Sequence, residues 1–491
     1  MSKPRLIINN SFCELVNFPK NIDALVSKIL SYTVDLSYEK SRIFYQIKLA
    51  KAKGQNKKVG FHVKQLKELE SQEFVEWYRD NKFPTGHLGL IKKVIALYYR
   101  RTKQKDAYII EDRREIPRNT ELFRMSNKLP ELRYYQQEMV DLGIEAGRGV
   151  FSASVGSGKT LVFMSLLKKI SVNSLIIVPS RPLLEQFYQE LENYFGSKYV
   201  EKIDTKKVRS NKVLKPIKIT TIQTLAALQK SKEIKTLLEP VEALFLDEFH
   251  HAGSASYTNL LDDVDHIYWR WGCSGTVCRT DHKTLDMHGV LSNILYEYPA
   301  SKAIAEGYLT PVAAKVLKLE GKRSNNYQKE YDKNYCGNPE LTEAIKYILK
   351  NETEDRQILI LVKRKDKSGK ILHEFLKMYG LTNTYISGDD KKDIINNAIA
   401  DFNDKKIRIL IGSTVIGEGI DIRSTDILIL AMGGKSEIAV TQAIGRCVRK
   451  YPGKDLAKVY DFDFSGTKFL HKHLLERKRI LVNNFGAEIE G

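Results

Sequence analysis

The sequence predicts an α/β fold in which two parallel sheets follow one another along the chain, behind a small α+β unit. Three observations predict it. A glycine-rich loop lies between a short apolar run and a helical pattern in residues 149–169. Apolar runs that end in polar residues recur after this loop with helical spacing between them, as in strand–helix–strand units. A second set of such runs begins near residue 357 and has no glycine-rich loop of its own.

The 491 residues are expected to divide into four parts. A chain of this length fits about three domains, and with 42% hydrophobic residues it can form sizeable cores. We expect a small α+β domain, a first α/β domain, a connecting segment, and a second α/β domain with a basic helical tail. Their predicted limits are residues 1–120, 130–300, 301–350 and 351–491.

The first domain is expected to be basic. Residues 1–130 contain 26 lysines and arginines against 14 aspartates and glutamates, which is +12 of the total net charge of +19. Such an excess favours a polyanionic partner, and a solvated basic face without a partner is the alternative. Alternation over residues 43–49, a turn at 53–56 and a run at 59–63 predict a basic β-hairpin. A helix over 86–105 should display a basic face made of Lys92, Lys93, Arg100 and Lys103.

The glycine-rich loop reads Ala153-Ser154-Val155-Gly156-Ser157-Gly158-Lys159-Thr160. Small residues at Gly156, Ser157 and Gly158 let successive backbone N–H groups turn towards an anion at the start of a helix. Lys159 would then neutralise the β- and γ-phosphates, and the Thr160 hydroxyl would bind Mg²⁺. The loop predicts binding of ATP or GTP, and a glycine-rich turn that matches by chance is the alternative.

Residues before the loop favour ATP over GTP. The segment Leu132-Arg133-Tyr134-Tyr135-Gln136 ends 23 residues ahead of Lys159. A glutamine amide can both donate to and accept from the adenine edge, whereas guanine presents the opposite pattern. We therefore assign Arg133 and Gln136 to the ATP site.

Later strands of the first set end in residues that suit catalysis and ligand binding. The apolar run 243–246 leads into Asp247-Glu248-Phe249-His250. Asp247 suits a Mg²⁺ contact, and Glu248 suits a base that polarises water. Polar residues also follow other runs of this set, at the edge where parallel sheets bind ligands. They are Pro179-Ser180-Arg181, Thr221-Ile222-Gln223-Thr224 and Ser274-Gly275-Thr276.

The second set is expected to complete the nucleotide site from across a cleft. Its predicted strands cover residues 357–362, 383–387, 407–412, 426–430 and 458–461. Arg446 and Arg449 are three positions apart on a predicted helix. They could both reach a γ-phosphate from one helical face. A basic helix end without such a role is the alternative.

In combination these motifs resemble those of superfamily 2 helicases and translocases, over about residues 130–465. Residues 247–250 stand where that family has motif II, and Ser274-Gly275-Thr276 stands where Ser-Ala-Thr is usual. Residues 412–421 and 442–449 resemble motifs V and VI. The resemblance implies two RecA-like motor domains that use ATP and Mg²⁺ to move along DNA.

The same resemblance implies roles for particular side chains. Lys159, Asp247, Glu248, Arg446 and Arg449 would act in catalysis. Ser274, Thr276 and Gln442 would couple hydrolysis to movement, and Asp421 would contact the nucleotide ribose. DNA contacts would come from Pro179, Arg181, Thr224 and Thr414, besides the basic face of the first domain.

A narrower resemblance concerns two stretches, residues 83–93, which begin Phe83-Pro84-Thr85-Gly86-His87, and Gly434-Lys435-Ser436 followed by residues 442–450. Both are similar to stretches of the bacteriophage UvsW-type branched-DNA helicases. This likeness implies a monomeric motor that unwinds or branch-migrates forks, junctions and displacement loops in recombination and fork rescue, with RNA:DNA hybrids left open as a further substrate. The translocating subunit of a restriction or repair system and an ATP-gated nucleic-acid-binding scaffold are the alternatives.

Other sequence features bear on the setting of the chain. Five cysteines without a CxxC pair suggest neither a disulfide framework nor a zinc site. No segment approaches the roughly 18 apolar residues that a membrane span requires. We expect a cytoplasmic protein without a membrane partner, in the host cytoplasm if it is a phage protein.

Overall fold

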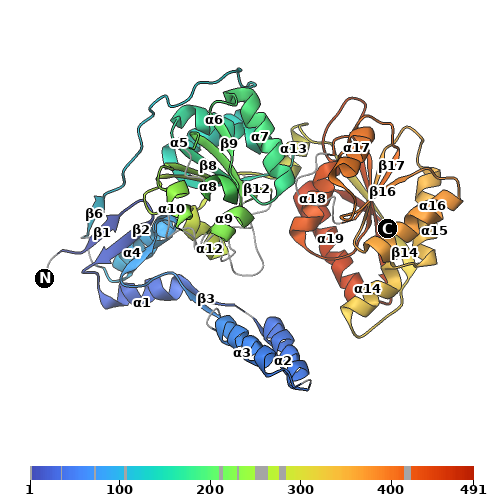
Figure 1. Ribbon diagram of the computed structural model, residues 1–491, viewed down its shortest axis with the longest axis horizontal. Helices are drawn as coiled ribbons and strands as arrows, with labels where there is room; N and C mark the ends of the chain where they lie inside the picture. The colour runs from blue at the N-terminus through green and yellow to red at the C-terminus, as the bar shows by residue number, and fades with distance from the viewer. Residues whose placement is uncertain are drawn as a thin grey trace.

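The computed structural model describes residues 3–34, 36–52, 54–70, 73–103, 108–209, 214–228, 232–248, 264–275, 284–413 and 422–491. Two sheet domains lie side by side, and the N-terminal unit packs against the first of them (Figure 1). No helix in the described ranges is long and apolar enough to cross a membrane.

The N-terminal unit is built on a four-stranded mixed sheet in the order β5-β2-β1-β6. Strands β1 and β2 are antiparallel, and β1 and β6 are parallel. Helix α4 buries Ile91, Ile95 and Tyr99 in one hydrophobic core with residues of this sheet. The elements are β1 (Arg5–Ile8), β2 (Phe12–Val16), α1 (Lys20–Ile29), β3 (Ser31–Thr33), α2 (Ser37–Ala52), α3 (Asn56–Glu70), β4 (Phe74–Glu76), β5 (Lys82–Pro84), a 3₁₀ turn (Thr85–His87), α4 (Leu88–Arg101) and β6 (Ile109–Asp112).

The predicted β-hairpin over residues 43–63 is wrong, because this segment folds as the two helices α2 and α3. The predicted turn is present, and Gly54 adopts a left-handed conformation with φ of 64°. The segment also has helical spacing, since Ile47 and Ala50, three positions apart, form the buried side of α2. Lysine, glutamine and alanine in this segment favour a helix over a strand.

The first sheet domain has a seven-stranded parallel sheet in the order β13-β7-β12-β11-β8-β10-β9. All five residues of β8 and of β11 are buried, as expected for strands with helices on both faces. The elements are α5 (Tyr134–Ala146), β7 (Arg148–Ala153), α6 (Lys159–Ile170), β8 (Ser174–Val178), α7 (Arg181–Phe195), β9 (Val200–Lys202), α8 (Thr205–Arg209), β10 (Ile217–Thr221), α9 (Ile222–Leu228), α10 (Glu233–Leu238), β11 (Ala243–Asp247), β12 (Trp269–Ser274), α12 (Thr284–Val290), β13 (Ile294–Tyr298) and α13 (Ala300–Ala305).

The second sheet domain repeats this architecture in the order β16-β17-β15-β18-β19-β14-β20, again all parallel. Its elements are β14 (Val312–Glu320), α14 (Tyr327–Tyr335), α15 (Pro339–Asn351), β15 (Ile358–Val362), a π-helical turn (Lys365–Lys370), α16 (Ile371–Met378), β16 (Thr384–Ile386), α17 (Lys392–Asn403), β17 (Ile409–Gly412), β18 (Ile427–Ala431), α18 (Glu437–Cys447), β19 (Ala457–Ser465), α19 (Phe469–Phe485) and β20 (Glu488–Glu490).

The predicted fold class, two parallel α/β domains behind a small α+β unit, is confirmed. One part of the predicted division needs correction. Residues 301–350 were expected to connect the domains, but β14 within them pairs with β19 along nine residues and belongs to the second sheet. Lysines and a glutamate at its exposed positions gave β14 the polar composition of a connection.

Buried arginines attach the N-terminal unit to the first sheet domain. Arg148 of β7 donates to the carbonyl oxygen of Asn10, and Arg270 of β12 donates to the hydroxyl of Ser11. Both arginine side chains are buried, and burial lowers the pKa of Arg148 to about 10. Buried charged groups are stable only when hydrogen bonded, so these contacts fix the unit in place.

The stretch Phe83 to Gly89, noted above for its resemblance, forms the second half of this attachment. At Gly86 a Cβ atom would lie 1.9 Å from the carbonyl oxygen of His288 on α12. Only glycine permits so close an approach of two backbones. The Ser292 hydroxyl donates to the Gly86 carbonyl oxygen at 3.3 Å. The resemblance at this stretch therefore coincides with a packing requirement.

Candidate active site

The glycine-rich loop connects β7 to α6 and is shaped to hold an anion. Gly156 and Gly158 adopt left-handed conformations, with φ of 81° and 77°. A Cβ at Gly158 would lie 2.4 Å from Nε2 of Gln136. Lys159 and Thr160 begin the helix, so the loop N–H groups and the positive end of α6 meet at one point.

Three predicted side chains meet beside this loop. The Nζ atom of Lys159 lies 3.1 Å from Oε1 of Glu248, and the Ser274 hydroxyl donates to Oε2 of Glu248 at 3.2 Å. Burial acts to lower the pKa of Lys159, but the charges of Glu248 and Asp247 outweigh it and raise that pKa. The lysine is therefore a permanent cation, available to phosphate oxygens.

The backbone holds Glu248 in an unusual conformation. Asp247 ends β11 and lies opposite Cys273 on the neighbouring strand β12. Glu248 follows with φ of 47°, a left-handed value that a residue with a side chain rarely adopts. Strain of this kind is retained where a side chain must point in a defined direction. Here it directs the carboxylate towards Lys159 and Ser274.

Gln136 fastens the loop to α5. Its Nε2 donates to the Ser157 carbonyl oxygen at 2.8 Å, and its Oε1 accepts from the backbone N–H of Arg133 at 2.9 Å. The Tyr135 hydroxyl donates to the same Ser157 carbonyl at 3.1 Å. Because both ends of the Gln136 amide are engaged within the protein, its predicted contact with adenine stays a prediction.

A cavity of about 810 Å³ opens beside the loop, a volume typical of small-molecule sites. From the first sheet domain and the connection it is lined by Arg133, Gly156, Gly158, Gly307, Tyr308 and Leu309. The second domain contributes Arg423 and residues 449–455. The Arg133 guanidinium lies 4.5 Å from the centre of the Tyr308 ring. The cavity thus joins both domains, as a shared nucleotide site requires.

The chain's residues fit ATP with Mg²⁺. The loop leaves no room for a Cβ atom at Gly158, and Lys159 supplies a cation beside it. Thr160 at the helix start and the buried Asp247 are oxygen ligands of the type Mg²⁺ prefers. Within the described residues no group of three or more His, Cys, Asp or Glu side chains could hold a metal by itself.

Helix α18 brings the second domain onto the loop. A Cβ atom at Gly445 would lie 2.8 Å from Cβ of Val155 in the loop. The helix ends at Cys447, so Arg449 lies beyond it and forms an isolated antiparallel bridge with Leu309. The prediction that Arg446 and Arg449 share a helical face is therefore corrected, because only Arg446 is in the helix.

The two arginines also line different cavities. Arg449 lines the cavity beside the loop, whereas Arg446 and Gln442 line a second one of about 690 Å³. That second cavity is bounded by Ser180 of the first domain and by Lys363, Ser413 and residues 432–436 of the second. It adjoins the predicted nucleic-acid residues after β8.

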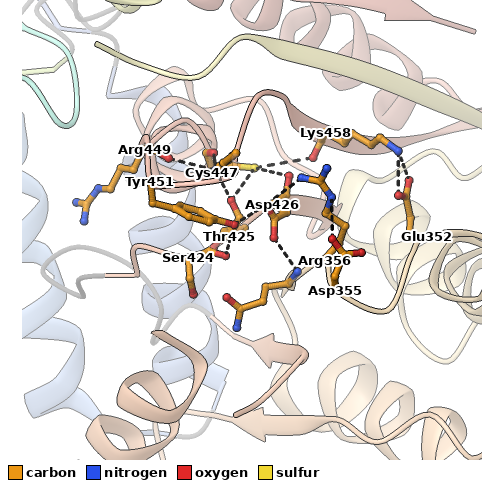
Figure 2. A network of polar contacts seen from close by, with 12 residues as sticks. Glu352, Asp355, Arg356, Ser424, Thr425, Asp426, Cys447, Arg449, Tyr451 and Lys458 are labelled. Carbon is orange, nitrogen blue, oxygen red and sulfur yellow. Dashed lines mark hydrogen bonds and ion pairs between the residues drawn. The ribbon is translucent and has the colours of Figure 1, made fainter. Parts of the chain in front are cut away.

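A polar network holds the segment of Arg449 (Figure 2). The buried Lys454 donates to the carbonyl oxygens of Thr425, Cys447 and Arg449. Tyr451 donates to the Asp426 carboxylate, which also accepts from the backbone N–H of Gln357 at 2.9 Å. Burial lowers the pKa of Lys454. The network joins the end of motif VI to residues 424–426, just after motif V.

Other predicted residues are distributed as follows. Pro179, Arg181 and Thr224 lie after the adjacent parallel strands β8 and β10, and Gln223 donates to the Pro179 carbonyl oxygen at 2.9 Å. Lys92, Lys93 and Arg100 lie on α4 of the N-terminal unit, and Lys103 lies two residues after this helix. Thr276, Thr414 and Asp421 lie outside the described residues, as do Phe249 and His250.

Sequence reasoning missed Tyr308 and Lys454. Tyr308 lies within residues 301–350, the predicted connecting segment, and this was the only local signal for it. Lys454 looked like any surface lysine, because one of its three carbonyl partners, Thr425, lies 29 residues earlier in the chain. The other two partners, Cys447 and Arg449, are close in sequence but form no recognisable motif with it.

Two protein-family models match parts of this chain. The family model described as the res subunit of type III restriction enzymes matches residues 129–277, and the helicase conserved C-terminal domain matches residues 340–451. Together they cover more than half of the chain.

Individual relatives are similar at low identity. A putative helicase of Sulfolobus islandicus filamentous virus is 24% identical over 73% of this chain and 68% of its own length. The ATP-dependent DNA helicase uvsW of Enterobacteria phage T4 is 26% identical over 70% of each chain. A fragment of a putative HsdR subunit of a Vibrio vulnificus type I restriction enzyme shares the fold. Its TM-score is 0.54 and its identity 16%, over 81% of this chain and 72% of the fragment.

The two matched domains occur in the order and at the positions of the two parallel sheets, with the phosphate loop in the first and motif VI in the second. Both sheet domains are RecA-like. The chain belongs to the ATP-dependent helicases of superfamily 2.

Proposed function

We propose that this protein uses ATP hydrolysis to unwind or branch-migrate forked and junction DNA. The observation that carries the proposal is the basic N-terminal unit, which buried Arg148 and Arg270 attach to the first motor domain. A motor tracks the phosphate backbone without reading sequence. A rigidly attached basic module gives it a means of selecting a branch by shape. Recombination and replication-fork rescue are the processes that supply such substrates.

In the proposed cycle Lys159 and the loop N–H groups hold the ATP phosphates, and Glu248 orients and deprotonates the attacking water. When Lys159 turns towards phosphate, its contact with Glu248 is released. The hydrogen bond from the Ser274 hydroxyl would still hold this carboxylate. Ser274 thereby links the state of the nucleotide to the segment that follows it. Arg449 reaches the same cavity from the second domain.

The catalytic assignment predicts separate effects for two variants. Lys159→Ala should abolish ATP turnover because the phosphate charge loses its partner. Glu248→Gln should bind ATP but reduce turnover by about 100-fold or more, since general bases contribute about 10²–10⁴-fold. DNA-stimulated phosphate release and nucleotide binding are measured side by side. If Glu248→Gln turned over ATP at the wild-type rate, Glu248 would not be the general base.

The branch assignment is tested with labelled forks, four-way junctions, displacement loops, R-loops and plain duplexes. The wild-type protein should unwind branched substrates in preference to plain duplex. A Lys92/Lys93/Arg100/Lys103 quadruple Ala variant should lose part of this activity. Its binding should become less salt dependent, by about 0.9 in log–log slope for each lost phosphate contact. If the salt dependence of binding and the unwinding of junctions were both unchanged, these four residues would serve only to keep the domain soluble.

A second function, translocation within a restriction or repair system, is favoured by the match of residues 129–277 to a restriction-enzyme subunit model. It predicts displacement of a triplex-forming strand along plain duplex at a rate independent of branches. The same substrate panel with one triplex-bearing duplex distinguishes the two functions.

A further inference from the structure

The α2–α3 hairpin stands out from the rest of the molecule. Figure 1 shows the two helices projecting beyond the N-terminal sheet, below the first motor domain in this view. They rise from the two-stranded ribbon β3–β4 and pack against each other. Ile47 and Ala50 of α2 are buried between them, while no described residue of α3 is fully buried. The hairpin therefore presents most of its surface outward.

This outward surface is aromatic. Phe44, Tyr45 and Phe61 are 54%, 63% and 59% exposed, and Leu49 and Val63 are exposed as well. Single exposed apolar residues need no explanation, but a group of five on one small projection indicates an interaction surface. In the described part of the chain these five side chains stay exposed to solvent.

The aromatic residues alternate with positive charges. On α3, Lys57, Lys58 and Lys64 lie four and three positions before Phe61 and three after it, so all three are its neighbours on the helix surface. On α2, Lys48 is the corresponding neighbour of both Phe44 and Tyr45. Residues 37–70 contain nine lysines and arginines against three glutamates, a net charge of +6. The partner must therefore offer both negative charge and flat apolar faces.

The base of the hairpin is fastened to the first motor domain. The Tyr32 hydroxyl of β3 donates to one oxygen of Asp286 at 2.6 Å, and the Trp77 indole N–H donates to the other at 2.7 Å. Asp286 is buried in α12, which begins ten residues after Ser274. The hairpin is thus held as an arm of the domain that hydrolyses ATP.

We propose that the α2–α3 hairpin contacts unpaired bases at a DNA branch point, with Phe44, Tyr45 and Phe61 stacking on the bases and the surrounding lysines holding the phosphates. Aromatic side chains stack on any exposed base, because every base has a flat π-face. A closed duplex hides its base faces, whereas a branch exposes them beside dense phosphate charge. The inference rests on the proposed function and names the contact through which branches are selected.

Photocrosslinking without ATP tests this contact. A fork carries 5-iododeoxyuridine either at the branch nucleotide or deep in one duplex arm. The full-length protein should crosslink through Phe44, Tyr45 or Phe61 from the branch position alone, as identified by mass spectrometry. Equal crosslinking from both positions, or none at these residues, would overturn the proposal.

Two variants separate stacking from charge. Phe44/Tyr45/Phe61→Ala should lose at least about fivefold in affinity for forks relative to plain duplex and keep the wild-type salt slope, since a single stacking contact of about 1 kcal/mol already corresponds to that factor. Lys57/Lys58/Lys64→Ala should weaken both substrates and lower the slope by about 0.9 for each lost contact. The matched control is Tyr347/Met378/Ile394→Ala, which removes comparably exposed side chains from the second motor domain. It should bind as wild type.

Retention of fork preference by the aromatic variant would contradict base stacking. Binding of the wild-type protein to phosphatidylserine vesicles, together with absent crosslinks, would assign the hairpin to an anionic membrane surface and also overturn the proposal. These measurements need no hydrolysis. If the wild-type protein bound forks as described but failed to unwind any substrate, the proposed function would fail while this inference stood.

Discussion

At Gly445 the second motor domain packs directly against the nucleotide loop of the first. Its position allows the α18 backbone to meet Val155 with no intervening side chain, because any Cβ would lie 2.8 Å from that of Val155. Gly275 is different, since a Cβ there would make ordinary contacts of 3.6 to 3.7 Å with Ala153, Lys159 and Val155. The departure from the usual Ser-Ala-Thr is thus not required by space.

We expect Gly445→Ala to reduce DNA-stimulated ATP turnover by about tenfold or more, because a misplacement of about 1 Å can cost up to a hundredfold. Alanine is about 1 kcal/mol better than glycine in a helix, so weakening of α18 could not explain the loss. Gly275→Ala is the control and should stay active. Steady-state kinetics on single-stranded DNA compare the two, and equal activity would contradict the domain contact.

At the level of elements, α18 and the turn after it depend on a lysine that the sequence did not reveal. Lys454 links Thr425, Cys447 and Arg449 through their carbonyl oxygens, so Lys454→Met should release the Arg449 segment. We expect lower kcat with nearly unchanged ADP affinity. Lys458→Met is the control, because Lys458 pairs with Glu352 at 2.9 Å at the outer end of the same network (Figure 2). An equal loss of kcat in both variants would show that the effect comes from general destabilisation of the second domain and not from release of the Arg449 segment.

The strands of both parallel sheets were predictable because uninterrupted apolar runs such as 175–178 and 358–362 have few other stable environments. The α2–α3 segment was not, because its residues 43–49 satisfy strand alternation and one-sided helix burial equally well. Strand β14 was missed since its outward positions carry lysines.

The same distinction applies to the site. Lys159, Asp247, Glu248 and Ser274 follow from motifs that are local in sequence, and the structure brings them together. Tyr308 and Lys454 depend on contacts between distant segments, which no local pattern records. The roles of the individual residues remain predictions.

For the whole molecule, the joint between the N-terminal unit and the first motor domain should respond to acid. His87 of the 3₁₀ turn is buried close to His288 of α12, and burial, followed by the charge of His288, lowers the pKa of His87 to about 3. Above its ordinary value of 6.5 the residue is neutral in both the docked and the released state. Between about 6.5 and 3 only the released state binds a proton, so docking weakens as the pH falls.

We therefore expect the melting temperature of the wild-type protein to fall as the pH is lowered from 7.5 to 5. The melting temperature of a His87→Gln variant should fall less over the same range. Differential scanning calorimetry of both proteins measures this. The variant has no imidazole to protonate at this position, although His288 keeps part of the effect. Parallel pH profiles would show that His87 does not contribute.

The pair Arg148 and Arg270 has a consequence for a broken chain. Both guanidinium groups lie inside the joint and hydrogen bond to residues 10 and 11, whereas the backbone that leads from the N-terminal unit to α5 is largely exposed over residues 113–122. A protease cut there would sever the covalent link and leave the joint intact. The two pieces would migrate as one particle, and the motor alone, started at residue 130, would emerge with two arginines facing solvent on a surface shaped for a missing neighbour.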